Sequence, residues 1–294
     1  MSAVLQHVVD MVSVGGLYAL MALGIGLIFG IMRLINFAHG ELIMVGGYAT
    51  WLVVDLPGVA VIVLTLAIVV LFAIGMERIA FRPLRDASPA TLLVAAFAVS
   101  YFLQNLALVM FGGRPKPFTF ADTLIEQVTI AGLRIPQLQV MSLVLTVLTL
   151  VGLAVILKRT NIGVQMRAAA QDFRMARLAG IRANRVIALA FLISGVLAWV
   201  VSVVYAAQIG QISPTMGLQP VIVGFVATVI GGLGSLSGAV IGGFLVGSLT
   251  VALQALLPGD LREFRDAFLF TGLLLVLLVR PSGIIATRAL KERV

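Results

Sequence analysis

Polar side chains able to bind or relay a small solute gather near the start of the chain. Arg33, Asn36, His39 and Glu41 fall in the stretch 32–48, which reads MRLINFAHGELIMVGGY, and long apolar runs enclose it on both sides. Ionisable groups at membrane depth are expensive, so they usually face the interior of a helix bundle or a water-filled path. If this stretch lies in a bilayer, its chemistry is that of a site or path for a polar solute.

Signatures of catalysis and of resident cofactors are missing from the sequence. No G-x-x-x-x-G-K-[ST] phosphate loop occurs, so the chain cannot bind and hydrolyse ATP in that manner. His7 and His39 are far apart and cysteine is absent, which leaves no ligand pattern for a metal site. Ser235 lacks the glycine two residues before it that a nucleophile elbow requires. We expect a non-catalytic protein with no metal and no cofactor of its own.

The composition predicts a polytopic membrane protein of the all-α class. Of the 294 residues, 61% are hydrophobic and 11% are charged, against about 25% charged in globular domains. Several segments are apolar over about 18 residues or more, the length of a membrane-spanning helix. No polar stretch is long enough to bury a core of its own, so we expect residues 1–294 to form one transmembrane domain.

Eight apolar runs follow one another along the chain. They are 11–31, 41–54, 59–76, 89–111, 139–157, 186–207, 218–257 and 267–280. The run 218–257 is too long for one crossing of a bilayer core of about 30 Å, so we expect it to form two passes or two half-helices. The sequence therefore predicts nine crossings. Eight or ten remain open, because 41–54 and 267–280 are short.

The net charge of +8 follows from membrane sidedness rather than from a nucleic-acid partner. Fourteen of the 20 basic residues fall in segments 78–86, 158–185 and 280–294. Short loops rich in Lys and Arg stay on the cytoplasmic side. We therefore place these three segments inside, and the N-terminus with the remaining loops outside. No nucleic-acid partner is expected.

Glycines mark a second break in the apolar pattern. Gly231, Gly232, Gly234 and Gly238 interrupt the run 218–257. Glycine accepts backbone conformations and close backbone contacts that side chains obstruct. We expect a turn or a close helix crossing at this helix break.

Two parts of the chain share a plan in which apolar helices flank a break. They are 15–49 and 217–250, although their residue identities do not match. Interrupted hydrophobic segments in corresponding halves are typical of transporters built from repeats, whose path lies at the breaks. Small-xxx-small spacings, such as Gly238/Gly242 and Gly243/Gly247, favour close helix packing in lipid.

The loop 158–185 predicts a short cytosolic helix. Residues Val164 to Ala179 have high helix propensity, and Gly180 is a typical stop. At helical spacing, one face consists of Met166, Ala169, Ala170, Phe173 and Ala176. The helix could lie on anionic lipid or enter a groove on a cytosolic partner. Its alanines favour the second interpretation, because lipid-surface helices prefer bulky apolar residues.

Several motifs resemble one known family. MRLINFAHGELIMVGGYAT is similar to the signature after the first span of branched-chain amino-acid permeases of ABC importers. AAAQDFRMARLAGIRANRVIALAF resembles that family's coupling loop, including Ala170, Asp172, Ala176 and Gly180. QISPTMGLQPVIVGFVATVIGGLGSLSGAVIGG and LLLVLLVRPSGI also look like the family, in the H-type subunit pattern. The loop departs from the general E-A-A pattern.

This resemblance implies an all-helical type II importer fold with broken helices, in a bacterial inner membrane. The implied partners are a second homologous permease subunit, two cytosolic ATPase subunits that bind the ATP, and a periplasmic substrate-binding protein. The implied substrate is leucine, isoleucine, valine or a related solute, with urea or a short amide as alternatives. The residues expected to serve ATPase coupling are Ala169, Ala170, Asp172, Phe173, Ala176 and Gly180.

Two hypotheses remain for the polar stretch. In the first, Asn36, His39, Gly40 and Glu41 line or shape the translocation path. In the second, Asn36 and His39 cap a helix end while Glu41 pairs with Arg33.

A secondary transporter or channel that works without ATPases is a further alternative. It would use the polar stretch as a proton or ion relay. Uptake driven by a proton gradient alone would favour this alternative.

Overall fold

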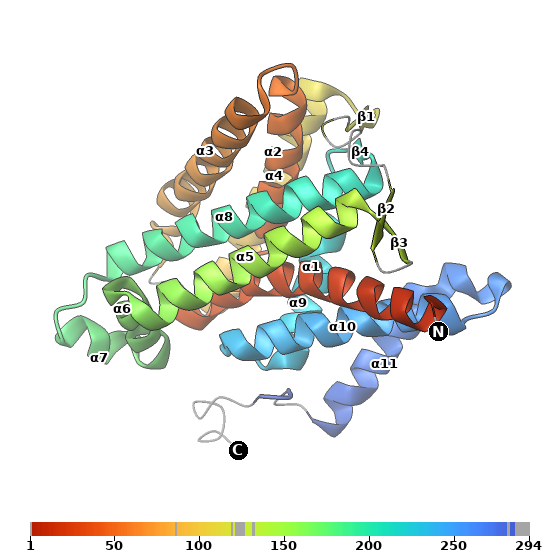
Figure 1. Cartoon of the computed structure of the whole chain (residues 1–294). Helices are drawn as coiled ribbons and strands as arrows, with labels where there is room; N and C mark the ends of the chain where they lie inside the picture. Colours follow the sequence, from red (N-terminus) through yellow and green to blue (C-terminus); the bar gives the residue numbers. More distant parts are fainter. Residues whose placement is uncertain are drawn as a thin grey trace.

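The computed structural model describes residues 2–85, 87–118, 120, 127–130, 133–280 and 283–285. Helices make up most of it, which confirms the all-α class (Figure 1). In chain order the elements are α1 (Ser2–Met32), α2 (His39–Val53), α3 (Gly58–Met76), the π-helical turn η1 (Glu77–Phe81), α4 (Pro89–Phe111), β1 (Lys116–Pro117), β2 (Gln127–Ile130), β3 (Leu133–Pro136), α5 (Gln137–Arg159), α6 (Asn161–Gln171), α7 (Phe173–Leu178), α8 (Ala183–Ile209), β4 (Gln211–Ile212), α9 (Leu218–Gly231), α10 (Leu236–Leu256), the 3-10 turn η3 (Gly259–Phe264) and α11 (Arg265–Val279).

The predicted apolar segments all form helices, but their lengths differ. Among the described residues, six helices are long and apolar enough to cross a membrane: α1, α3 continued by η1, α4, α5, α8 and α10. The helices α2, α9 and α11 have 15, 14 and 15 residues, or about 21–23 Å, shorter than a bilayer core of about 30 Å. The run 218–257 divides into α9 and α10, as predicted. The nine predicted segments therefore form six helices of full length and three short ones within the described residues.

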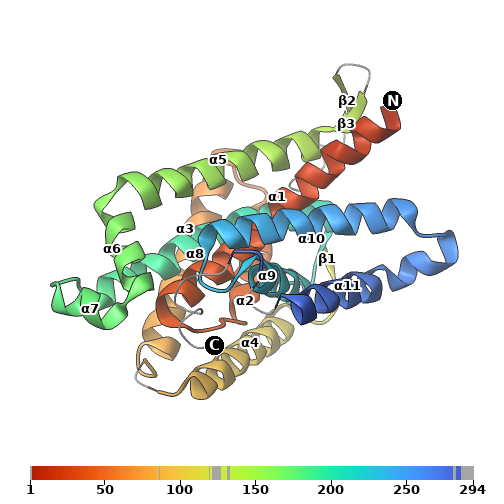
Figure 2. The ribbon, with the colours of Figure 1, turned by 90° about the horizontal axis from the view of Figure 1, so that it is seen from below.

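Helix α1 is the centre of the bundle (Figure 2). It contacts α5, α8, α9 and α10, and 83% of its most apolar stretch is buried inside the chain. In contrast, less than a third of the corresponding stretches of α3, α4 and α5 is buried. The outer faces of these three helices carry exposed apolar side chains such as Leu71, Tyr101 and Val109, as expected of helices that meet lipid or a partner subunit.

Small residues bring α1 and α10 into backbone contact. A Cβ added to Gly243 would overlap Ala19 on α1, and one added to Gly247 would overlap Gly15. Gly242 likewise faces the Ala227 carbonyl of α9. The close packing predicted from the small-xxx-small spacing is confirmed, since no side chain fits between these backbones.

The loops gather at two opposite ends of the bundle (Figure 1). At one end β1 pairs antiparallel with β4, and Gln139 at the start of α5 donates a 2.7 Å hydrogen bond to Asp10 near the start of α1. At the other end Arg85, after η1, donates to Asn184 at the start of α8. We call the first the outer end and the second the inner end, because the basic loops lie at the second. The predicted inner segment 280–294 lies mostly outside the described residues.

Candidate functional site

Two short helices begin side by side within the bundle. Gly40 lies in the first turn of α2, and Gly217 directly precedes α9. A Cβ on either glycine would overlap the backbone carbonyl of the other. The two helix starts therefore meet through their backbones.

Contacts along the long helices show that these starts lie deep in the bundle. His39 packs on Gly24, about two turns before α1 ends at Met32. From there α2 follows α8 toward the outer end, with Gly46 against Ser202. Helix α9 follows α1 toward the inner end, since Thr228 packs on Gly26 and Gly234, just after α9, packs on Gly30. Thr228 also donates a 2.9 Å hydrogen bond to the Ala22 carbonyl.

The two short helices thus start together and run in opposite directions. Each directs the positive end of its dipole toward the bundle interior. Discontinuous helices that meet in this way are typical of the binding regions of transporters.

Glu41 is fully buried beside α4. Its Oε1 accepts hydrogen bonds from Ser100 Oγ at 2.7 Å and from Gln104 Nε2 at 2.8 Å. Its exposed fraction is 0%. Among the described residues the ion pairs are Arg85–Glu77 and Arg265–Asp266, so the alternative pairing of Glu41 with Arg33 is wrong.

Asn36 and His39 do not cap α2. The N-cap residue is Ala38, and no side chain accepts a hydrogen bond there. His39 Nδ1 lies 3.0 Å from Ser194 Oγ on α8, and Asn36 Nδ2 lies 3.9 Å from Met76 Sδ. The capping alternative is therefore wrong as well, because both side chains turn into the bundle.

Buried polar atoms with spare hydrogen-bonding capacity cluster around α2. Within the described part of the chain, seven such atoms have no partner, and five of them lie on or beside α2: Asn36 Oδ1, His39 Nε2, Glu41 Oε2, Tyr48 OH and Ser202 Oγ. Buried polar groups are nearly always satisfied by protein or water. Their concentration beside one short helix suits a region that hydrogen-bonds to water or a passing solute. We call these five residues the polar centre.

The second break consists of close backbone contacts between glycines and one side-chain cap. Gly232 and Gly234 have φ of +112° and +86°, and Ser235 Oγ caps α10 by accepting from Gly238 N at 3.0 Å. A Cβ on Gly231 or Gly238 would overlap the carbonyl of the other. The predicted turn and close crossing are both present.

The loop 158–185 folds as two helices rather than one. The prediction of a single helix from Val164 to Ala179 is wrong, because α6 ends at Gln171 and α7 begins at Phe173. Asp172 is extended, with φ of −147°, and its Oδ1 caps α7 by accepting from Met175 N at 2.9 Å. Because an extended residue cannot continue a helix, α6 ends here, and the chain changes direction before α7 begins. Gly180 ends α7 with φ of +84°, as predicted.

The predicted alanine face lies against the chain's own helices. Ala169 and Ala176 are buried, and Ala170 and Phe173 pack against the core. Helix α6 contacts α1, α5 and α8. The opposite side presents Met175 and Leu178, which are 60% and 76% exposed.

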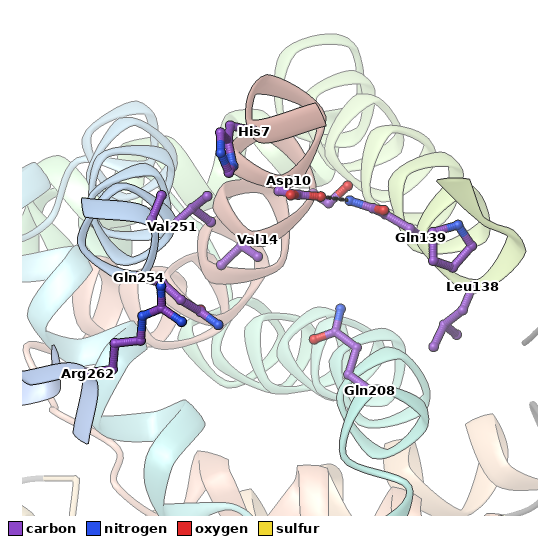
Figure 3. Close-up of a pocket in the computed structure, with 12 residues that line it drawn as sticks. His7, Asp10, Val14, Leu138, Gln139, Gln208, Val251, Gln254 and Arg262 are labelled. Carbon is purple, nitrogen blue, oxygen red and sulfur yellow. Dashed lines mark hydrogen bonds between the residues drawn. The ribbon is translucent and has the colours of Figure 1, made fainter. Parts of the chain in front are cut away.

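A polar cavity of about 640 Å³ opens at the outer end. Figure 3 shows its lining from α1, α5, α8, α10 and η3. Its polar residues are His7, Asp10, Ser13, Gln139, Gln208, Gln254 and Arg262. The sequence pattern did not identify these residues as a group, because they lie near the ends of long apolar helices that are far apart in the chain.

Sequence reasoning also missed the partners of the polar stretch. Ser100 and Gln104 are four residues apart in a mostly apolar helix, so they share one face. That spacing is a signal that could have identified them. No comparable signal marks Ser194 or Gly217, because a single serine or glycine is common in membrane helices.

Comparison with known proteins supplies the context for this geometry. The family model described as branched-chain amino acid transport system / permease component matches residues 7–279. The high-affinity branched-chain amino acid transport system permease protein BraD of Pseudomonas aeruginosa is 36% identical over 96% of this chain and 95% of its own length. The corresponding protein LivH of Escherichia coli is 34% identical with the same coverage. An autoinducer 2 import system permease protein, LsrC of Yersinia enterocolitica, is 30% identical over 44% of this chain and 38% of its own. No solved structure gives a significant match.

The family match and the two long alignments include the polar stretch, both breaks and the coupling loop. Together with the helical membrane fold they confirm the resemblance drawn from the motifs. The chain belongs to the family of branched-chain amino acid transport system permease components.

Proposed function

We propose that this chain is the inner-membrane permease subunit of an ATP-driven importer of leucine, isoleucine, valine or a closely related amino acid. The observation that carries this proposal is similarity along 96% of the chain to two permease proteins named for high-affinity branched-chain amino acid transport. In the assembly the chain pairs with a second homologous permease subunit. Two cytosolic ATPases bind the ATP, and a periplasmic binding protein delivers the substrate.

The polar centre and the paired starts of α2 and α9 form part of the translocation path. Asn36, His39 and Glu41 contribute side chains, and Gly40 permits the close approach to Gly217. An amino acid crossing the bundle needs hydrogen-bonding groups to replace lost water. The polar centre offers such groups, because five of its buried polar atoms have no hydrogen-bond partner.

Helices α6 and α7 couple the permease to the ATPases. Ala169, Ala170 and Ala176 allow α6 and α7 to pack closely against the bundle. A movement of the ATPases that displaces these two helices is therefore transmitted to the membrane-spanning helices. Asp172 and Gly180 fix the two ends of α7. The exposed Met175 and Leu178 are the apolar anchors for a groove on the ATPase.

Reconstitution tests this function directly. The chain, its second subunit, the ATPases and the binding protein are placed in vesicles, and uptake of radiolabelled leucine is measured with and without ATP. We expect uptake that requires both ATP and the binding protein. Uptake driven by a proton gradient without ATPases would instead establish the secondary-transporter alternative.

The second substrate class is a small polar solute other than an amino acid, such as urea or a short amide. A relative aligned with 44% of this chain is named for the import of another solute that is not an amino acid, autoinducer 2. The same vesicles, supplied with a binding protein for urea or a short amide, distinguish the two classes. Leucine uptake with no uptake of these solutes supports the amino-acid assignment.

A further inference from the structure

The inner end holds a cavity of about 880 Å³ whose lining is strongly cationic. Six arginines from four parts of the chain line it: Arg33, Arg82, Arg85, Arg177, Arg182 and Arg185. They follow α1, follow η1, lie on α7 and surround the start of α8. No Asp or Glu lines this cavity in the part of the chain that the structure describes.

Only one of these arginines is neutralised by a described carboxylate. Arg85 pairs with the buried Glu77 and also donates to Asn184, while its Nε is buried without a partner among the described residues. Like charges drawn together in a hollow repel one another unless an anion balances them. The cavity therefore has the electrostatics of an anion site.

The backbone at the cavity wall supports the same conclusion. Arg33 has φ of +56°, and it is the non-glycine residue with positive φ among those described. This conformation is strained for a long side chain. It places an arginine at the lining of the cavity immediately after α1 ends.

Apart from Asn184, the remaining lining is apolar. Ile31, Leu92 and Ile187 at the ends of the spans and Phe173 on α7 lie beside the arginines. A small free anion would make no favourable contact with these apolar side chains. An anionic amphiphile would contact both the arginines and the apolar residues. Basic pockets between membrane helices on the cytoplasmic side are suited to anionic lipid head groups.

We propose that this inner cavity binds the phosphodiester head group of an anionic phospholipid such as phosphatidylglycerol. The arginines hold the phosphate through charged hydrogen bonds, often two from one guanidinium. The apolar residues contact the glycerol and the first methylenes. Because Phe173 and Arg177 form part of the wall, the bound lipid also ties α7 to α1, α4 and α8. This proposal does not depend on the transported substrate.

Native mass spectrometry of the purified transporter tests the site. The protein is delipidated in mild detergent and titrated with phosphatidylglycerol or with phosphatidylcholine of the same acyl chains. We expect retained phosphatidylglycerol and little phosphatidylcholine. Arg82→Gln and Arg182→Gln should each weaken retention about fivefold, since a basic residue near the membrane surface contributes about 1 kcal/mol.

Arg262→Gln is the matched control, because it removes an arginine from the cavity at the outer end. It should leave retention unchanged. Arg82→Lys should restore most of the binding, and size-exclusion profiles establish that each variant is folded. The double glutamine variant combines Arg82→Gln with Arg182→Gln. If this double variant does not fold, the two single variants provide the measurement.

Titration with inorganic phosphate distinguishes the source of the anion. Weak competition at high concentration supports a lipid head group. Tight binding of free phosphate with no retention of phosphatidylglycerol would overturn the lipid assignment. Equal retention by the wild-type protein and the double glutamine variant, or occupancy by an acidic segment of a partner protein instead, would also overturn it.

Discussion

The two breaks in the helical pattern solve different physical problems. Between α1 and α2, residues 33–38 return the chain into the bundle and bring polar side chains with it. Between α9 and α10, residues 232–235 form a tight turn of left-handed glycines with a serine cap. The order is also reversed, since a long helix precedes a short one at the first break and follows it at the second.

This difference separates chemistry from packing. The first break contributes Asn36, His39 and Glu41, whose polar atoms have spare hydrogen-bonding capacity. The second has close backbone contacts, such as Gly231 against Gly238. We therefore expect substitutions at the second break to reduce folding, and conservative substitutions at the first to reduce transport while the fold remains.

The largest effect is expected from Gly231→Leu. Its side chain would have to occupy the position of the Gly238 carbonyl, and backbone cannot yield as a flexible side chain can. We expect a loss of several kcal/mol of stability, measured as the yield of monodisperse protein and its melting temperature. Gly272→Leu on α11 is the control, because nothing lies within 4 Å of its Cβ position. Equal yields of the two variants would contradict close packing at this break.

A smaller loss is expected from Gly234→Val. Its φ of +86° lies in the left-handed region, where a β-branched residue is strained by about 1–2 kcal/mol or more. Gly234→Asn should be milder, since asparagine tolerates this region. Melting temperatures of the two variants check the ranking. A valine variant as stable as wild type would show that the turn readily adopts another conformation.

Glu41→Gln should leave the fold nearly intact and lower uptake. The replacement keeps the size of the side chain but removes its carboxyl group and places an amide near the amide of Gln104. A buried polar group left without its hydrogen bond costs about 1–3 kcal/mol, so we expect roughly a tenfold fall in ATP-driven leucine uptake. Unchanged uptake would remove Glu41 from the path, and a collapse of expression would assign it a structural role.

The smallest effect is expected from Ser100→Ala. It removes one of the two donors to Glu41 Oε1, while Gln104 remains. We expect uptake to fall severalfold, as for the loss of about 1 kcal/mol of hydrogen bonding. Ser142→Ala on α5 is the control, because its hydroxyl donates to a backbone carbonyl of its own helix. If both alanine variants transport leucine equally well, the hydrogen bond from Ser100 to Glu41 does not contribute to transport.

Local signals in the sequence predicted much of this fold. Apolar length identified the helices, and the glycines identified the division of 218–257. The coupling loop shows the limit of such signals. Helix propensity favours one helix there, but Asp172 competes by capping a new one. Propensity also could not reveal that the alanine face is covered by α1, α5 and α8.

The polar centre was only half visible in the sequence. Asn36, His39 and Glu41 stand out because they interrupt an apolar run. Ser194 and Ser202 come from a helix more than 150 residues away, and their meeting with α2 depends on how the helices cross. Such long-range contacts are set by tertiary packing rather than by local pattern.

The role of the coupling loop can be tested by matched leucine substitutions. Leu178→Ser on α7 and Leu256→Ser at the outer end of α10 remove side chains that are 76% and 81% exposed. We expect only the first to lower ATPase co-purification and receptor-stimulated ATP hydrolysis. Normal coupling in Leu178→Ser would remove this side chain from the ATPase interface.

Cysteine accessibility tests most directly whether the polar centre lies on the translocation path. The chain has no cysteine, so Ser202→Cys introduces a single thiol beside Gly46 of α2. Thr250→Cys is the control, since that hydroxyl donates within α10. We expect a water-soluble thiol reagent to modify the first variant at a rate that changes during ATP-driven turnover, and to spare the second. Equal protection of both thiols during turnover would contradict a path through the polar centre.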